Sequence, residues 1–400
     1  MTKKKTGNNQ YLKQLNQSII LDLIRIHKSI SKAELSQITG LSPTATGMIT
    51  SSLLEAGYIY ETGTGESKGG RKPVMLELKP GSFYSLGVDY DVNYINVILV
   101  DITGEIIYEQ QADLSEGEVF TSVITRTQVM IRNIMDKFRI STERLLGIGF
   151  SIPGMVDSEN NVIVLAPNLG WKKADVNACM KEFSKVPIYV ENEAMASAIC
   201  ENWIGSCQGV NSFVCINVKS GIGAGIFTHG RLYRGSGGCA GEVGHIVVDE
   251  NGPRCGCGNY GCLETMASTT RMVEKSRRLV RQGTVSILNK YENTDQIGID
   301  QIVEAARMGD ETARNILTES ARYLGIAISN LVNTLNPSKV VIGKEFVKYS
   351  DLVIHYIKEV VNSKALQSAA SKVEITASAV GEKASTLGAA IIPLKVLFGK

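Results

Sequence analysis

Apolar residues near the start of the chain recur at the spacing of a helix. Steps of three and four residues separate Leu12, Leu15, Ile19, Leu23 and Ile26, which predicts a helix with an apolar stripe along one face. A capping box then opens a second helix, because the Ser31 hydroxyl can cap a backbone N–H while Glu34 reaches back. This helix carries Leu35 and Ile38 and stops at Gly40.

A third helix follows the glycine. Ser42-Pro43 supplies an N-cap and a first-turn proline, and the helix ends near Gly57. Its apolar residues are expected to point inward: Met48, Ile49, Leu53 and Leu54. A short helix, a glycine turn and a helix with a small polar leading face are typical of a helix-turn-helix, whose second helix enters the major groove. We expect DNA contacts from Ser42, Thr44, Thr46 and Thr50. The alternative is a structural three-helix bundle without a ligand.

Two alternating segments, Tyr58–Tyr60 and Val74–Leu78, predict a pair of strands. The residues between them are rich in glycine and carry the cations Lys68, Arg71 and Lys72. A slim arginine between glycines suits a narrow minor groove, where the negative potential is strongest. The segment 1–80 is therefore predicted to be a winged helix-turn-helix that binds double-stranded DNA. A solvated hairpin tip is the simpler reading of the loop alone.

The remaining chain alternates between strand-like and helical patterns. The expected strands lie near residues 84–89, 94–101, 105–110, 147–152, 186–190, 212–218, 340–342 and 373–375. Long helical patterns occupy the region 300–335. Strands that alternate with helices indicate an α/β class.

Charge divides the chain in the same place. The net charge of +2 hides 11 Lys and Arg against 6 Asp and Glu in residues 1–80, a net +5, so the remainder carries −3. A basic front part is suited to a polyanion, although a solvated basic tail has the same composition. No apolar run approaches the ~18–20 residues of a membrane span. Polar sequence follows the basic start, so we expect no secretory signal, no membrane insertion and a cytoplasmic location.

Three of the eight cysteines lie close together in the sequence. Nine residues separate His245 from Cys255, and Cys257 and Cys262 follow, with glycines between them that let the chain fold around one point. Four nitrogen and sulfur ligands suit a tetrahedral Zn²⁺, and a site filled by protein is structural. We therefore expect one structural Zn²⁺ per chain; a chance group of cysteines is the alternative. The other five cysteines are expected to pack in the interior: Cys179, Cys200, Cys207, Cys215 and Cys239.

The segment Gly241–His245, the cysteine run and Gly261–Glu264 together resemble the signature of the ROK family. That family comprises repressors, open reading frames and sugar kinases on an actin-like, ribonuclease-H-like fold. The resemblance runs from about residue 84 to the C-terminus, and the added winged helix resembles the branch of xylose and N-acetylglucosamine repressors. It implies a ROK sugar-sensing domain over 81–400 with two lobes, about 81–195 plus the C-terminal helix, and 196–380.

The resemblance also implies a sugar site. The residues that match the family's sugar contacts are Asn192, Glu193, Glu242, His245 and Glu264, and Gly154 and Asn168 lie on loops of the same cleft. His245 would hold zinc through one ring nitrogen and a sugar hydroxyl through the other. Carboxylates that read several hydroxyls discriminate strongly, because a missing hydroxyl leaves a buried group unpaired. Each acid taken alone could be an ordinary surface charge. Trp171 either stacks on the sugar or packs in the core.

The positions that handle ATP in the family's kinases are altered here. The phosphate hairpin Asp-x-Gly-x-Thr reads Asp89–Asn93, with Asp91 in place of the glycine. Glu193 replaces the catalytic Asp, a degenerate base position, and Gly343-Lys344 replaces a Gly-Gly pair. The second phosphate loop is partly kept as Lys219–Gly225. We therefore expect no enzyme activity and no catalytic residue.

These features predict a sugar-responsive repressor of carbohydrate-utilisation genes. We expect it to bind a palindromic operator as a homodimer or homotetramer, with a sugar as effector. The triplet Glu191-Asn192-Glu193 resembles the xylose branch more than the kinases, which favours xylose or a related sugar. An ATP-dependent sugar kinase and a zinc-stabilised scaffold for a protein partner are the alternatives. The operator sequence and the polarity of the sugar's effect stay open.

Overall fold

The computed structural model of the chain describes residues 9–64, 73–115 and 117–399. It divides into two compact units. The first contains Met1–Ile152, Ser158–Glu191 and Ala389–Lys400, and the second contains Pro153–Asp157 and Asn192–Gly388. The domain boundaries predicted near residues 80 and 195 stay predictions. Among the helices of the described residues, none combines the length and apolar character that a membrane span requires.

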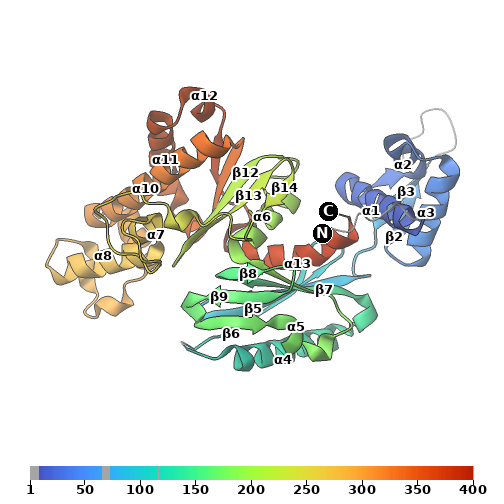
Figure 1. The fold of residues 1–400 in the computed structure, drawn as a ribbon, viewed down its shortest axis with the longest axis horizontal. Coiled ribbons are helices and arrows are strands. Elements are labelled where there is room, and N and C mark those ends of the chain that lie inside the picture. The colour runs from blue at the N-terminus through green and yellow to red at the C-terminus, as the bar shows by residue number, and fades with distance from the viewer. Residues whose placement is uncertain (1–8, 65–72, 116, 400) are drawn as a thin grey trace. The chain divides into compact units, whose positions relative to one another are not determined.

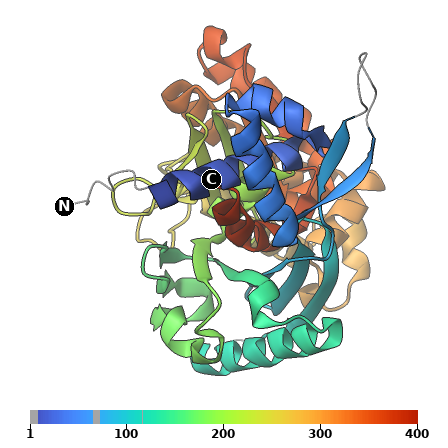
Figure 2. The same cartoon turned by 90° about the vertical axis from the view of Figure 1, so that its right-hand side faces the viewer.

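The N-terminal part of the first unit contains the three predicted helices and a small antiparallel sheet (Figures 1 and 2). The helices are α1 (Asn9–His27), α2 (Lys32–Thr39) and α3 (Pro43–Glu55), and the strands are β1 (Ile30–Ser31), β2 (Ile59–Thr64) and β3 (Val74–Leu78), paired in the order β1-β3-β2. The predicted capping box is present: the Glu34 N–H donates to the Ser31 hydroxyl at 3.2 Å, and the Ser31 N–H donates to the Glu34 carboxylate at 2.9 Å. Local sequence therefore fixes where these helices begin.

The buried faces of these helices differ from the predicted ones. On α1 the interior residues are Ile20, Leu21 and Ile24, whereas most of the predicted stripe is exposed. Met48 was expected to point inward, and this is wrong, because it is 71% exposed. The period of the pattern was correct, but the side of each helix that meets its neighbours depends on tertiary packing.

A mixed five-stranded sheet forms the core of the first unit. Its strands pair in the order β11-β7-β4-β5-β6, with β4 (Tyr84–Tyr90), β5 (Tyr94–Asp101), β6 (Ile106–Asp113), β7 (Leu145–Ile152) and β11 (Ile188–Asn192). Helix α4 (Phe120–Phe138) lies along one face and α13 (Ala384–Leu397) along the other (Figure 1). The Ser85 hydroxyl donates to the carbonyl of Ala390 at 2.7 Å, so a side chain of β4 anchors the second half of α13. A smaller sheet joins β8 (Met155–Asp157), β9 (Val162–Ala166) and β10 (Trp171–Asp175).

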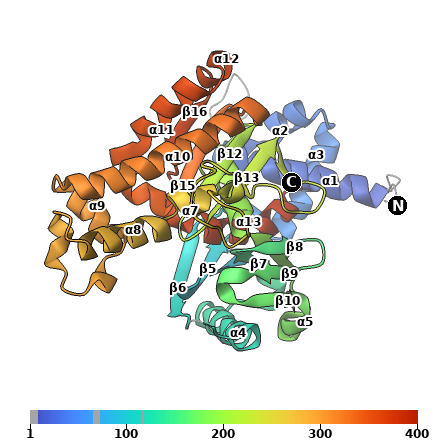
Figure 3. The ribbon, with the colours of Figure 1, turned by 60° about the vertical axis from the view of Figure 1, so that its left-hand side comes forward.

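The second unit repeats this plan. Its sheet has the order β14-β13-β12-β15-β16, with β12 (Phe213–Val218), β13 (Ile222–Thr228), β14 (Arg231–Tyr233), β15 (Lys339–Lys344) and β16 (Glu374–Ala377). In both sheets three antiparallel strands are followed by a strand parallel to the first, and a fifth strand pairs beyond it. Helix α6 (Glu193–Trp203) packs on β12 and β13. Figure 3 shows α8 (Thr269–Arg281), α9 (Ile299–Arg307), α10 (Glu311–Leu335) and α11 (Ser350–Lys364) grouped on one side. The predicted α/β class is confirmed.

Candidate functional site

One His and three Cys side chains converge in the second unit. The ligand atoms of His245, Cys255, Cys257 and Cys262 all lie within 4.8 Å of one another. The Nδ1 atom of His245 is 3.6 Å from the Cys255 sulfur, and the sulfurs of Cys257 and Cys262 are 3.7 Å apart. A tetrahedron around Zn²⁺ with bonds of about 2.3 Å has edges of about 3.8 Å. The spacing of these atoms therefore fits a single tetrahedral metal ion.

The backbone around this cluster folds tightly because glycines allow it. A Cβ at Gly261, whose φ is +64°, would lie 1.5 Å from the carbonyl oxygen of Asp249. The Cys255 N–H donates to the Asn259 carbonyl at 2.7 Å, which closes the loop that carries two of the sulfurs. Only glycine at position 261 lets the two segments approach so closely. The predicted role of the glycines in this loop thus has a steric basis.

The environment of the sulfurs differs from one to the next. Desolvation, together with the neighbouring thiols, raises the pKa of Cys262 above its ordinary value. A backbone hydrogen bond from Asn259 lowers the pKa of the exposed Cys257. A dication bound among the four ligands would stabilise the thiolate form of both, since metal binding releases their protons.

Two carboxylates lie next to the His/Cys cluster. Burial of its carboxylate raises the pKa of Glu242, with the Glu264 carboxylate acting in the same direction and His245 opposing them. One oxygen of Glu264 accepts the backbone N–H of Ile222 at 3.1 Å. That oxygen would also lie 2.9 Å from a Cβ at Gly221. The Glu264 carboxylate therefore packs against the loop 219–225, which resembles the second phosphate loop of the kinases.

The next predicted sugar residues lie where α6 begins. The Asn192 side-chain oxygen accepts the N–H groups of Ala194 and Met195 at 2.8 and 3.2 Å, and its amide nitrogen donates to the Gly154 carbonyl at 2.9 Å. Asn192 is thus the N-cap of α6 and also fixes the Gly154 loop. Glu193, the first residue of α6, is half-buried.

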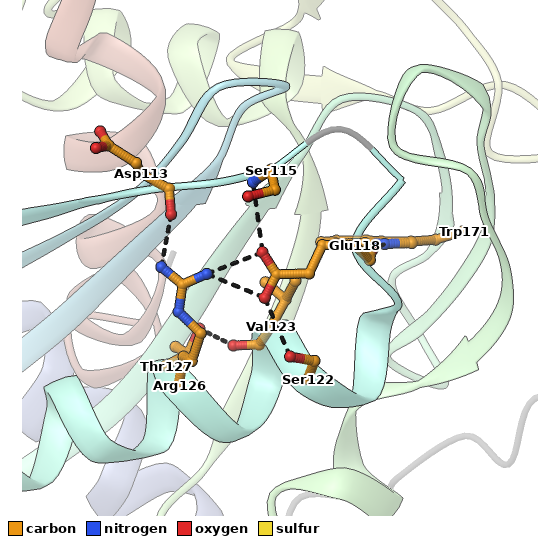
Figure 4. Close-up of polar contacts among 8 residues, drawn as sticks. All are labelled: Asp113, Ser115, Glu118, Ser122, Val123, Arg126, Thr127 and Trp171. Carbon is orange, nitrogen blue, oxygen red and sulfur yellow. Dashed lines mark hydrogen bonds and ion pairs between the residues drawn. The ribbon is translucent and has the colours of Figure 1, made fainter.

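The other two candidates belong to the first unit. Asn168 is exposed on a short 3₁₀ turn, and the structure does not group it with the other predicted sugar residues. Trp171 is buried: its ring packs edge-on against Tyr90 and Phe120, and its indole N–H donates to the Glu118 carbonyl at 3.0 Å. Figure 4 shows Trp171 beside Glu118 and the pair that Arg126 makes with the Glu118 carboxylate. Of the two roles considered for Trp171, core packing is the one observed.

Two positions that serve ATP in kinases are filled by side chains here. Asp91 follows β4 and is buried, and its carboxylate accepts the Asn93 N–H at 3.3 Å, so the hairpin turns around a carboxylate. Lys344 is 2% exposed, and its ammonium donates to the Ser385 hydroxyl at 2.6 Å. Its φ of +59° lies in the left-handed region, a conformation that glycine adopts without strain.

The predicted DNA contacts divide between the two sides of α3. Ser42 caps α3 and is exposed, as is Thr44. Thr46 and Thr50 are fully buried, and the Thr50 hydroxyl donates to the carbonyls of Thr46 and Gly47. The prediction that Thr46 and Thr50 contact DNA is therefore wrong, because both side chains lie inside the protein.

Sequence reasoning missed two residues on the outer side of α3. Thr44, Met48 and Ser51 are all exposed there and recur at steps of four and three residues. The same helical period used for the apolar face could have identified them once Met48 was placed outside. The predicted cations Lys68, Arg71 and Lys72 lie outside the described residues.

Comparison with known proteins identifies the body of the chain. Residues 85–396 match the ROK family. The chain belongs to the ROK family. Over 382 residues it is 34% identical to the xylose repressor of Caldicellulosiruptor bescii, covering 96% of each chain. It is 28% identical over 393 residues to the DNA-binding transcriptional dual regulator NagC of Escherichia coli, covering 98% of this chain and 96% of that one.

Solved ROK structures differ in the share of this chain that they cover. A ROK family transcriptional regulator, a homologue of the E. coli MLC protein, covers 97% of both chains with a TM-score of 0.85 and 29% identity. A ROK glucokinase of Streptomyces griseus, solved with glucose and AMPPNP, covers 98% of its own length but 77% of this chain, with a TM-score of 0.69 and 27% identity. The chain thus has the mixed α/β ROK fold that repressors and kinases share, and the regulator matches it over nearly its whole length.

Proposed function

We propose that this ROK protein is a sugar-responsive transcriptional repressor of carbohydrate-utilisation genes. The observation that carries the proposal is the N-terminal part of the chain. There the exposed side of α3 carries Thr44, Met48 and Ser51 beside the antiparallel pair of β2 and β3, and this supports a winged helix-turn-helix. The similarity to proteins named as repressors over nearly the whole chain supports it. Because a repressor works on the chromosome, a cytoplasmic location follows.

The outer side of α3 is the surface we assign to the major groove. Ser42 and Thr44 can donate to phosphates, and Met48 offers an apolar contact for a thymine methyl group. The predicted wing cations Lys68, Arg71 and Lys72 would add contacts to the phosphates or the minor groove. A palindromic operator would be read by two such heads in a homodimer or homotetramer.

The His/Cys cluster is the proposed zinc site. His245, Cys255, Cys257 and Cys262 would hold one structural Zn²⁺, because all four positions of a tetrahedron are then filled by protein. Zinc would fix the loop from which Glu242 and Glu264 extend. Together with Gly154, Asn168, Asn192, Glu193 and His245, these acids are our candidates for the sugar contacts. Xylose or a related sugar is the effector that the named relatives favour.

The alternative function is an ATP-dependent sugar kinase, and one feature favours it. The glycine run Gly221–Gly225 persists after β12, as in a phosphate loop. However, the Ile222 N–H in that run is already bonded to Glu264, and Asp91 and Lys344 fill two further ATP positions. A triphosphate would meet the Asp91 carboxylate where a kinase offers backbone N–H groups. We therefore propose that the protein is not an enzyme.

Selection of bound duplexes from a random DNA library with the full-length chain tests the proposal. We expect a palindromic sequence whose affinity, measured by fluorescence anisotropy, falls steeply as salt rises. Adding xylose or a related sugar should change that affinity, since a ligand with different affinities for two states shifts their balance. Non-selective binding would refute the repressor function. ATP consumption with a sugar panel would instead support the kinase, and sugar-independent DNA binding would support a protein signal.

A further inference from the structure

Helix α1 exposes a row of large apolar side chains that no other described residue covers. Leu12, Leu15, Ile19 and Ile26 are between 38% and 54% exposed, and Tyr11 at one end of the row is 47% exposed. The opposite side of α1 supplies the interior contacts described above. A contiguous apolar face of this kind on a single chain marks an interaction surface. We call these residues, together with the half-buried Leu23, the α1 stripe.

The spacing of the α1 stripe has a symmetry of its own. From Leu12 to Leu15, Ile19, Leu23 and Ile26 the steps are three, four, four and three residues. The order is the same in both directions, with Ile19 at the centre. Leu12, Ile19 and Ile26 are also seven residues apart, the repeat with which one helix packs along another.

A second, antiparallel copy of α1 matches this spacing. Ile19 then lies opposite Ile19 of the second copy, Leu12 opposite Ile26, and Leu15 opposite Leu23. A two-fold axis through Ile19 makes each contact occur twice, as an isologous interface requires. No other occupant has to be supplied, because every copy of the chain brings the complementary row.

We propose that the α1 stripe is the surface through which two copies of this chain join their N-terminal heads, antiparallel and centred on Ile19. With roughly 200 Å² for a fully exposed large side chain, the exposed fractions amount to about 450 Å² per copy. Two copies would bury about 900 Å² from these side chains alone, close to the ~1,000 Å² of a specific interface.

Two charged side chains of α1 are paired with each other within the chain. Asp22 and Arg25 already pair with each other at 2.8 Å within the chain, with side chains 12% and 16% exposed. The proposal rests on the proposed function in one respect: a palindromic operator needs two heads held together.

Photo-crosslinking of the full-length chain tests the contact directly. A benzophenone-bearing residue in place of Leu15 should give a covalent dimer on a denaturing gel, with and without operator DNA. Peptide mapping should place the adduct in residues 19–27 of the second copy. The same residue in place of Val285, which is 91% exposed in the second unit, is the control and should give no such adduct. An adduct within the same chain, one elsewhere on the second copy, or none would overturn the proposal.

A pair of double variants tests the antiparallel direction. In Leu12→Glu/Ile26→Lys, opposite charges meet twice across an antiparallel seam, whereas Leu12→Glu/Ile26→Glu brings like charges together. The first variant should retain at least half of the wild-type crosslink, and the second should lose at least fivefold. Equal loss in both would overturn the antiparallel contact. Crosslinking needs no operator, so a chain that crosslinks but binds no selected DNA contradicts only the repressor function, and the reverse result contradicts only the α1 stripe.

Discussion

Substitutions on the two sides of α3 should differ in how strongly they weaken operator binding. Thr44 is exposed and Thr50 is fully buried, although both carry a hydroxyl near the start of the same helix. We therefore compare Thr44→Ala with Thr50→Val, using the full-length chain and its selected duplex.

The expected magnitudes follow from what each hydroxyl contacts. Loss of one neutral hydrogen bond to DNA costs about 0.5–1.5 kcal/mol per head. Two heads double this to about 1–3 kcal/mol, so Thr44→Ala should weaken binding by roughly 5- to 150-fold. The Thr50 hydroxyl donates to the carbonyls of Thr46 and Gly47, which also accept from the helix backbone. Thr50→Val should therefore cost about 1 kcal/mol or less of stability and change DNA affinity less than twofold.

Fluorescence anisotropy at fixed salt measures the affinity, and circular dichroism during heating measures the stability of each variant. Met48→Ala belongs in the series, because an apolar contact to a thymine methyl group predicts a loss for some duplex sequences and not for others. If Thr50→Val remains folded and weakens binding more than Thr44→Ala, then α3 does not present the assigned side to DNA.

Further predictions concern the metal, the packing and the pH dependence. Cys257→Ser should reduce bound zinc, measured by mass spectrometry of the metal, from one per chain to near zero, and full retention would contradict the tetrahedral site. Gly149→Ala places a Cβ 2.0 Å from the carbonyl oxygen of Ala389 and should cost about 1–3 kcal/mol in thermal unfolding, whereas Gly237→Ala meets no atom within 4 Å and should cost little. Desolvation would raise the pKa of Asp310, but backbone N–H groups at the start of α10 lower it overall. The stability that Asp310 contributes is thus present above the ordinary carboxyl pKa and lost as the pH falls through the lowered one. Asp310→Asn should flatten this acid limb of stability, and an unchanged limb would contradict the assignment.

Features set by neighbouring residues could be predicted from the sequence. The Ser31–Glu34 capping box, the N-cap at Ser42, all five strands of the first sheet and three of the second lie where local pattern placed them. The strands β13 and β14 were not predicted, because the glycines of 221–225 indicated a loop. The His/Cys cluster was predictable for the same reason, since nine residues and a glycine-rich loop allow only a short excursion between its ligands.

The sequence predicted less well which side chains of a helix are buried, because burial depends on residues far away in the sequence. Thr46 and Thr50 are small and polar, which favours an exposed surface, yet the tertiary packing of the head encloses them. Cys239 was expected to pack inside and is exposed. A period of 3.6 residues indicates that a helix has two faces but does not indicate which face finds a partner. The α1 stripe shows the same limit, since its apolar residues lie on the outside of the chain.

Three candidate sugar residues, Glu242, His245 and Glu264, belong to the same loop system as the metal cluster. Cys262 ends the cysteine run, and Glu264, two residues later in the short helix α7 (Leu263–Ala267), reaches the Ile222 N–H. Glu242 and His245 lie on the 3₁₀ turn that faces the same cluster. A metal ion that fixes His245 and Cys262 therefore also fixes the origin of both carboxylates. Because the Ile222 N–H already donates to the Glu264 carboxylate, the glycine loop that resembles a phosphate site has this N–H group engaged within the protein. This hydrogen bond supports the proposal of a neutral ligand with several hydroxyl groups over that of a triphosphate.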